Sequence, residues 1–332
     1  MRPARVFARR GRLYAHPMAR KPILAAPAVL ALLLGLATLA SGTPVKRAPH
    51  CTIFPRDNHW NVRVDDLPVA SDSDRLVRSI GLGSTVHADF GSGLWDGGPI
   101  GIPYTTVSKR QRRVRVSFDY ADESDRGRYP VPRRAPIEGG RNSDGDRHVI
   151  VVDRDRCKLY ELYAAYPVSG GRRWRAGSGA VWNLRSNRLR PKGWTSADAA
   201  GLPILPGLAR YEEVRRGAID HALRFTASRT RRAYVYPARH LASSSDDPGL
   251  PPMGLRVRLR GSFDISGFGR QSRIVLTALK RYGMLLADNG SPWYISGAPS
   301  RGWDNDDLHE LGRVRGSDFE VVDTSSLPRP GE

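Results

Sequence analysis

Short segments in which apolar and polar residues alternate constrain the fold of this chain most. In residues 114–120, Val114, Val116 and Phe118 point to one side and polar residues to the other, which is the pattern of a half-buried strand. Residues 255–260 alternate in the same way, so their arginines are expected to face water. Further strands are expected at 148–152, 159–166, 222–226, 233–236, 284–287, 293–296 and 319–322.

Turn-forming residues separate these segments. The chain contains 34 glycines and 25 prolines, and an Asp-Arg-Asp-Arg turn joins residues 148–152 and 159–166 into an expected hairpin. Helical spacing is rarer and occurs at 73–80, 209–216 and 271–282. We therefore predict a mainly β fold, an antiparallel β-sandwich or jelly-roll-like domain with a few short helices.

The N-terminal segment has the layout of an export signal. Residues 22–40 are uncharged, follow a basic stretch and run into small residues, so residues 1–42 are predicted to be a secretory signal peptide and 43–332 a single secreted β-rich domain. The alternative is an uncleaved helix that anchors the protein, because a membrane span needs about 20 apolar residues. Membrane contact is expected only through that leader, and translation starts at either Met1 or Met18.

Cys51 and Cys157 are the only cysteines. An even pair in an exported chain predicts one disulfide, here closing a loop of about 100 residues. The alternative is two separate thiols. Neither cysteine has the spacing to a second cysteine or a histidine that structural zinc requires.

Arginine dominates the charge of the chain. The net charge is +20, or near +13 once the seven basic residues of the acid-free leader are removed, and only six residues are lysine. Such a surplus often indicates an acidic partner. The basic residues are scattered, however, so a compositional habit of the source genome explains them equally well. We expect no nucleic-acid partner.

Two segments place a carboxylate near an aromatic residue. Trp194 precedes Asp198 in a loop, and Asp288 ends an apolar run shortly before Trp293. Glycosidases use paired carboxylates as acid and as base or nucleophile, so Asp198 and Asp288 are the candidate catalytic residues. The alternatives are an ordinary loop packed by its tryptophan and, at Asn289-Gly290, a type I′ hairpin turn.

The candidate substrate-binding residues are three tryptophans and one histidine. An indole face packs against the apolar face of a pyranose, so sugar contacts are expected at Trp95, Trp194, Trp293 and His221. His87 and Asp89 share one face of an extended segment and form a further acid–base candidate, unless they only bind loop backbone.

The sequence predicts no cofactor and no metal. It contains no Gly-x-Ser-x-Gly elbow, no His-Glu-x-x-His pair and no phosphate-binding loop. The acidic turn at 122–125 is either a calcium ligand set or a solvated turn, and it lacks EF-hand spacing. Whether the histidines converge on a metal stays open for His87, His148, His221 and His240.

From Cys51 to about Thr324, the chain resembles a family of secreted bacterial and fungal proteins that is itself uncharacterised. The segments that carry the resemblance are Phe54–Asn61, His87–Gly93, Ala197–Arg210, Ile219–Phe225 and Ala287–Gly290. The resemblance implies export and one shared fold. It supplies no activity and no catalytic residues.

These patterns favour a secreted carbohydrate-active enzyme, a polysaccharide hydrolase or lyase that acts outside the cell without a cofactor. The alternative is a non-catalytic secreted protein that binds a polysaccharide or a cell-wall glycan. A metal-dependent hydrolase that uses the histidines is a third hypothesis. The sequence leaves the oligomeric state open.

Overall fold

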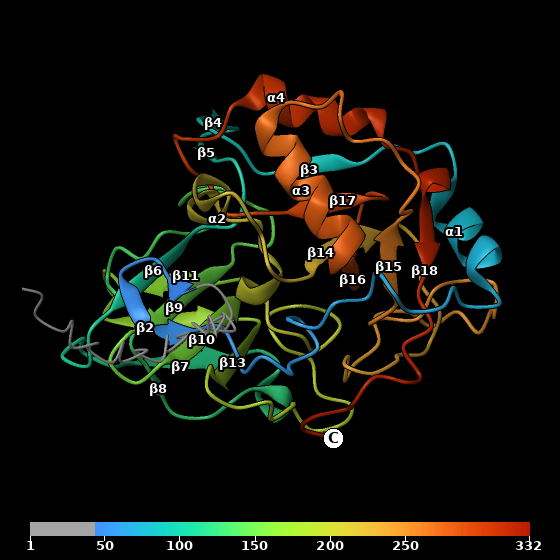
Figure 1. Ribbon diagram of the computed structural model, residues 1–332. Coiled ribbons are helices and arrows are strands. Elements are labelled where there is room, and N and C mark those ends of the chain that lie inside the picture. The colour runs from blue at the N-terminus through green and yellow to red at the C-terminus, as the bar shows by residue number, and fades with distance from the viewer. Residues whose placement is uncertain (1–43) are drawn as a thin grey trace, which may run out of the picture. The chain divides into compact units, whose positions relative to one another are not determined.

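Strands in three sheets of mixed direction form the body of residues 44–332, which are the residues that the computed structural model describes (Figure 1). The predicted signal peptide lies outside the described residues. All described residues belong to one compact unit. No helix among them combines the length and the apolar composition that crossing a membrane requires.

The first sheet, called the β10 sheet, has the order β13-β10-β9-β6. The predicted hairpin is its centre, because β9 and β10 pair in antiparallel fashion across the Asp-Arg-Asp-Arg turn, while β6 joins β9 in parallel. The strand bounds are Tyr104–Val107 for β6, Val149–Asp153 for β9, Lys158–Tyr163 for β10 and Ser178–Asn183 for β13.

The second sheet, the β7 sheet, has the order β11-β12-β7-β8, with β7 and β12 parallel. Its strands are β7 (Val114–Phe118), β8 (Arg128–Tyr129), β11 (Tyr166–Val168) and β12 (Arg173–Ala176). The third sheet, the β14 sheet, has the order β18-β15-β16-β14-β17-β3. Its strands are β3 (His87–Asp89), β14 (Leu223–Ala227), β15 (Arg256–Leu259), β16 (Met284–Asn289), β17 (Tyr294–Ser296) and β18 (Phe319–Val321).

Two short hairpins and the helices complete the described chain. The hairpins are β1 (Pro44–Val45) with β2 (Ala48–Thr52) and β4 (Leu94–Trp95) with β5 (Gly98–Pro99). The α-helices are α1 (Ser73–Gly81), α2 (Tyr211–Arg216), α3 (Arg270–Arg281) and α4 (Asn305–His309), and short 3₁₀ turns occupy Ala121–Glu123, Leu205–Gly207, Glu310–Arg313 and Gly316–Asp318.

Helix α3 shows how local sequence fixes an element. Its apolar stripe, which includes Val275, Leu276 and Leu279, is buried, and the helix contacts β15. At its start, the carboxylate of Asp307 accepts hydrogen bonds from the backbone N–H groups of Gln271 and Ser272 at 2.8 Å. These bonds satisfy donors that have no partner within the helix.

The mainly β prediction is confirmed, and most predicted strands form. The structure does not show the expected antiparallel β-sandwich or jelly roll, because each of the three sheets contains a parallel pair. The predicted strand at 233–236 is reduced to an isolated bridge between Tyr234 and Met253. The alternative of a hairpin turn at Asn289-Gly290 is also wrong, since β14 lies between β16 and β17.

The arginines of β15 are a further correction. Arg256 and Arg258 are buried rather than wet, because the segment 59–67 covers their side of the strand. Arg256 donates to the carbonyl oxygens of His59 at 2.6 Å and of Tyr282 at 2.9 Å. A planar guanidinium with five donors satisfies several carbonyls at once, so this strand is buried on both faces.

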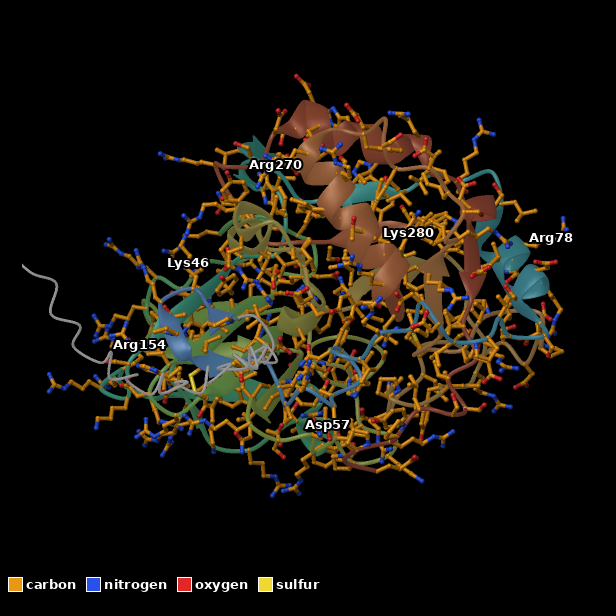
Figure 2. All side chains as sticks on the ribbon, viewed as in Figure 1. Lys46, Asp57, Arg78, Arg154, Arg270 and Lys280 are labelled. Carbon is orange, nitrogen blue, oxygen red and sulfur yellow. A yellow bond between two sulfur atoms is a disulfide. The ribbon has the colours of Figure 1, made fainter. Side chains whose placement is uncertain are left out.

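The disulfide is confirmed. Cys51 in β2 and Cys157 in the β9–β10 turn are bonded, with an S–S distance of 2.03 Å and 106 residues of separation. The bond attaches the first described hairpin to the β10 sheet. Basic side chains such as Arg78, Arg154 and Arg270 project at well-separated places, as the sequence indicated (Figure 2).

Candidate functional site

Arg224 lies at the centre of a group of carboxylates. It is the second residue of β14 and is buried. Its Nε and Nη2 donate to the two carboxylate oxygens of Asp198 at 3.0 and 2.8 Å, and its Nη1 donates to Ser296 Oγ at 2.6 Å. Burial alone would lower the pKa of Arg224, but Asp198 and Asp288 raise it above its usual value. The guanidinium is therefore a fixed positive charge.

Asp288 is the second carboxylate beside this guanidinium. It stands near the end of β16, with Oδ2 3.8 Å from Arg224 Nη2 and Oδ1 accepting from the backbone N–H of Asn289 at 2.8 Å. Burial, with the negative charge of Asp198, raises the pKa of Asp288 to about 7. Asp288 is therefore protonated in mildly acidic solution.

His148 forms a buried ion pair with Glu138. The imidazole Nδ1 lies 2.5 Å from Glu138 Oε2, and Nε2 lies 2.9 Å from the carbonyl oxygen of Ala197. Both partners only accept when Glu138 is ionised, so both ring nitrogens donate and the ring is an imidazolium. Burial acts to lower the pKa of His148, but Glu138 outweighs it and raises that pKa to about 9.

Glu138 is the ionised member of this pair. Burial acts to raise the pKa of Glu138, yet the positive charge and hydrogen bonds of His148 lower it below its ordinary value. The loop that carries Glu138 lies beside the β4–β5 hairpin, because Gly98 and Gly139 approach so closely that a Cβ on Gly98 would lie 2.1 Å from the carbonyl carbon of Gly139.

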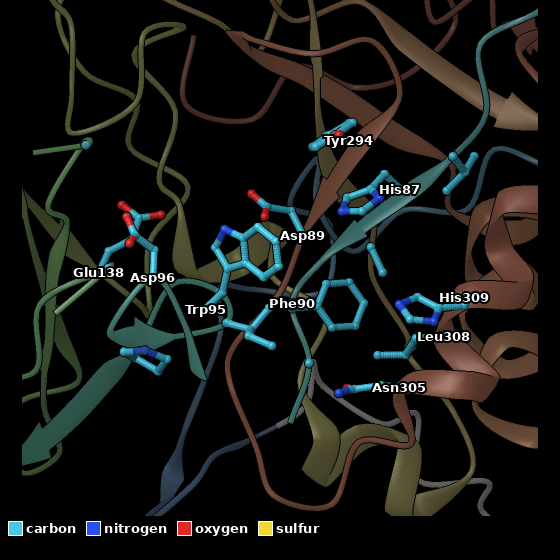
Figure 3. Close-up of a pocket in the computed structure, with 18 of the residues that line it drawn as sticks. His87, Asp89, Phe90, Trp95, Asp96, Glu138, Tyr294, Asn305, Leu308 and His309 are labelled. Atoms are coloured by element: carbon cyan, nitrogen blue, oxygen red, sulfur yellow. The ribbon is translucent and has the colours of Figure 1, made fainter. Parts of the chain in front are cut away.

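Two cavities adjoin these charges. The larger, of about 670 Å³, includes Asp89, Trp95 and Glu138 in its wall (Figure 3). The smaller, of about 380 Å³, includes Asp198 and Asp288. Because Glu138 lines the larger cavity and Ala197 the smaller, the two hydrogen bonds of His148 connect their walls.

Asp89 ends β3 at the larger cavity. Asp89 is exposed to the cavity, yet the partial loss of surrounding water, followed by the negative charge of Glu138, raises its pKa, although His87 and Arg224 oppose the change. The parallel pairing of β3 with β17 places His87 opposite Tyr294, and their rings stack with centroids 4.3 Å apart. Asp89 and Glu138 thus face one cavity with their pKa values shifted in opposite directions.

Trp95 provides an aromatic surface at the same cavity. It lies in the β4–β5 hairpin and is 79% exposed. In Figure 3 its indole stands between Asp89 on one side and Asp96 and Glu138 on the other. Large exposed aromatic side chains often mark binding surfaces.

The walls of both cavities are acidic. Eight carboxylates and no lysine or arginine line them among the described residues, namely Asp89, Asp96, Glu138 and Asp144 in the larger and Glu123, Asp146, Asp198 and Asp288 in the smaller. The whole chain has a net charge of +20. The cavities therefore differ in charge from the protein that surrounds them.

The structure brings the two expected catalytic residues, Asp198 and Asp288, to one cavity. They are not equivalent there. Asp198 is buried and both its oxygens accept from Arg224, whereas the Asp288 side chain is 25% exposed. The Asp288 carboxylate can therefore contact a ligand, whereas the Asp198 carboxylate cannot.

Two of the expected sugar-binding residues are inaccessible. Trp293 is fully buried between the stacked rings of Phe225 and Phe319, so neither indole face is available to a sugar. His221 is also buried, with Nε2 3.1 Å from Glu213, and it lines neither cavity. Their expected roles in substrate binding are therefore corrected.

Trp194 is half-buried and lines neither cavity, with the guanidinium of Arg190 5.4 Å from its ring centroid.

The sequence patterns did not indicate Glu138, Arg224 or the ion pair of His148. Arg224 did carry a signal, since it is a single charge inside the apolar run Ala-Leu-Arg-Phe. A charge at such a position is rarely buried without a partner.

One group of described residues has metal-like spacing. The ligand atoms of Glu138, Asp146 and His148 lie within 4.8 Å of one another. His148 has no free lone pair, however, because both its nitrogens donate. Among the described residues, the four histidines do not converge. His87 lines the larger cavity and His240 the smaller, while His148 is buried between them.

The acidic turn at 122–125 is engaged by protein groups. Asp125 pairs with Arg190 at 2.6 Å, and Glu123 accepts from the backbone N–H of Thr195 at 2.8 Å.

Comparisons of the chain with protein-family models, with curated proteins and with solved structures find no match.

Proposed function

We propose that this protein is a secreted polysaccharide hydrolase, with Asp89 as its general acid and Glu138 as its ionised carboxylate. The observation that carries the proposal is the opposite shift of these two pKa values at one cavity, beside the exposed ring of Trp95. Two carboxyl groups whose environments separate their pKa values are the arrangement that acid–base catalysis needs.

The directions of the two pKa shifts assign the roles in the reaction. Protonated Asp89 donates its proton to the glycosidic oxygen, and the bond from that oxygen to the anomeric carbon breaks. Glu138 stabilises the positive charge that develops on the sugar, either by attacking the anomeric carbon or by taking a proton from an attacking water. His148 keeps Glu138 ionised until it reacts.

Arg224 and its partners are positioning residues in this proposal. The bidentate contact with Asp198 fixes the guanidinium beside the smaller cavity, and its charge opposes the rise in the pKa of Asp89. Asp288 adds a second protonatable carboxyl at the smaller cavity. This assigns Asp198 an orienting role rather than a chemical one.

The charge of the cavity walls supports a neutral or amine-bearing glycan as substrate. Of the eight carboxylates, Asp198 and Glu138 are paired with Arg224 and His148. The ionised ones that remain, in walls without a lysine or arginine, disfavour an acidic polysaccharide and favour a cationic one. Hydrolysis is accordingly favoured over β-elimination, which requires a uronate. The apolar face of a neutral pyranose would pack against Trp95.

Secretion and membership of the family that the chain resembles belong to the same proposal. The disulfide supports export, because such bonds persist in oxidising compartments.

We also propose that the β10 and β7 sheets form a small two-layer sandwich, since both supply residues to one apolar cluster, among them Val151, Leu162 and Trp174.

The alternative is a glycan-binding protein without catalysis, which the exposure of Trp95 also supports. To separate the two, the mature protein is incubated with neutral, amine-bearing and acidic polysaccharides. New reducing ends and ultraviolet-absorbing unsaturated ends are both followed. We expect reducing ends from a neutral or amine-bearing glycan, without absorbance. Retention on a glycan without cleavage would support the alternative.

The catalytic assignment is tested with Asp89→Asn and Glu138→Gln. Each is expected to lower kcat/KM by about 100-fold or more, the usual contribution of an acid or base. Asp96→Asn is the matched control, because it removes a carboxylate from the same wall and Asn tolerates its positive φ. Full activity in both Asp89→Asn and Glu138→Gln would refute the assignment.

A further inference from the structure

The outward face of the β7 sheet carries four arginines. Strand β7 directs Arg115 outward while its neighbours Val114 and Val116 pack inward, and β12 directs Arg173 and Arg175 outward in the same way. Arg128 of β8 pairs directly with Arg115 in the ladder. We call this exposed set, Arg115, Arg128, Arg173 and Arg175, the arginine face.

No carboxylate neutralises the arginine face. Among residues 44–332, none of the four arginines forms an ion pair, and residues 1–43 contain no Asp or Glu. Asp119 continues the outward alternation of β7 past its end, but it pairs with none of them. Like charges directly opposite one another destabilise a strand pair. An anion bound between Arg115 and Arg128 would therefore relieve the repulsion between their guanidiniums.

The aromatic residue on this face, Tyr166, already contacts two guanidiniums. Tyr166 of β11 pairs with Arg175, whose guanidinium lies 5.2 Å from the ring centroid, and Arg147 lies 4.3 Å from the same centroid. The ring is 37% exposed and holds Arg175 in place, and it is the one aromatic residue among the outward residues of the four strands. Single-stranded nucleic acids need aromatic surfaces on which successive bases stack, so this face suits a polymer read by charge.

We propose that the arginine face binds a linear acidic polysaccharide. Neighbouring strands are about 4.8 Å apart and outward residues on one strand about 6.7 Å apart, so the four guanidiniums form a flat array of closely spaced positive charges. Each guanidinium matches a carboxylate or sulfate with two parallel hydrogen bonds. The proposal is independent of the hydrolase, whose acidic cavities would take a different glycan.

The test is affinity electrophoresis of the whole protein through gels that contain polygalacturonate, dextran sulfate or neutral dextran. The variant replaces all four arginines of the face by glutamine. The control replaces four other exposed arginines, Arg185, Arg215, Arg229 and Arg301, and so loses the same charge. Both sets lie on the surface, and thermal unfolding verifies that each variant is folded.

We expect the wild type and the control to be retarded by at least one of the acidic polymers, and more strongly than by dextran. The face variant should bind at least about tenfold more weakly, with a salt dependence reduced by about three ions. Polygalacturonate and dextran sulfate distinguish carboxylate from sulfate recognition. Equal loss in both variants, retardation by dextran as strong as that by the acidic polymers, or tighter binding to a short single-stranded oligonucleotide would each overturn the proposal.

Discussion

At the scale of single residues, one buried proton determines the state of the candidate site. His148 donates to Glu138 and to Ala197 at once, and the acceptor character of both partners fixes its charge. The sequence marked His148 as one of four histidines on strands but did not identify Glu138 as its partner. The pairing forms because the loop that carries Glu138, ten residues earlier in the chain, folds back against the start of β9. No rule of sequence spacing predicts such a contact.

Replacing His148 by glutamine should raise the pKa of Glu138, because a neutral amide replaces the charged donor. The acid limb of the pH–rate profile then moves to higher pH, and nuclear magnetic resonance of labelled carboxyl groups measures the same shift without an assay. His240→Gln is the control, since His240 lines the smaller cavity without contacting Glu138. An unchanged pKa of Glu138 would contradict the ion pair.

Asp288 gives a second prediction at this scale. Its folded pKa of about 7 lies above the unfolded value of 3.8, so its contribution to stability is complete below pH 3.8 and is lost as pH rises through 7. Asp288→Asn should therefore flatten the fall in melting temperature between pH 4 and pH 7. Asp96→Asn, at an exposed position of the other cavity, serves as the control.

At the scale of elements, alternation predicted strands well and their surroundings poorly. Strands β7, β9 and β10 lie where the pattern placed them. In β15 the same alternation predicted that the arginines face water, but Arg256 is buried against carbonyl oxygens. Alternation records which side chains share a face, whereas burial depends on what covers that face. Here the cover is a segment nearly 200 residues earlier.

Arg256→Met should lower the free energy of unfolding by about 3 kcal/mol, since it leaves several buried carbonyl groups without donors. Chemical denaturation measures the change. Arg273→Met on the exposed side of α3 removes the same group without a buried contact, and it should stay within about 0.5 kcal/mol of wild type. Comparable losses in both variants would show that Arg256 has no special structural role.

At the scale of the whole molecule, long-range links hold the β10 sheet to the start of the described chain. The cysteine count predicted the disulfide because only one pairing exists. The strand order of the β14 sheet was not predictable, since β3 joins β17 from more than 200 residues away. The site is made at such junctions, which is why the sequence suggested Asp198 and Asp288 but not their arrangement around Arg224.

Removing the disulfide with Cys51→Ala and Cys157→Ala together should lower stability by up to about 4–5 kcal/mol, because the bond closes a loop spanning 106 residues. Denaturant titration of the variant against the oxidised protein measures the loss. Adding a reductant to the variant is the control and should change nothing. A stability equal to that of wild type would mean that the unfolded chain is not restricted by this link.

The position of His148 has a consequence for how the two cavities respond to alkali. The same imidazolium donates a hydrogen bond to Glu138 in the wall of the larger cavity and one to Ala197 in the wall of the smaller. Above a pH of about 9 the ring loses one proton and keeps only one N–H to donate. One of the two contacts must then be given up, so the cavities cannot both keep their neutral-pH shape once that proton has left.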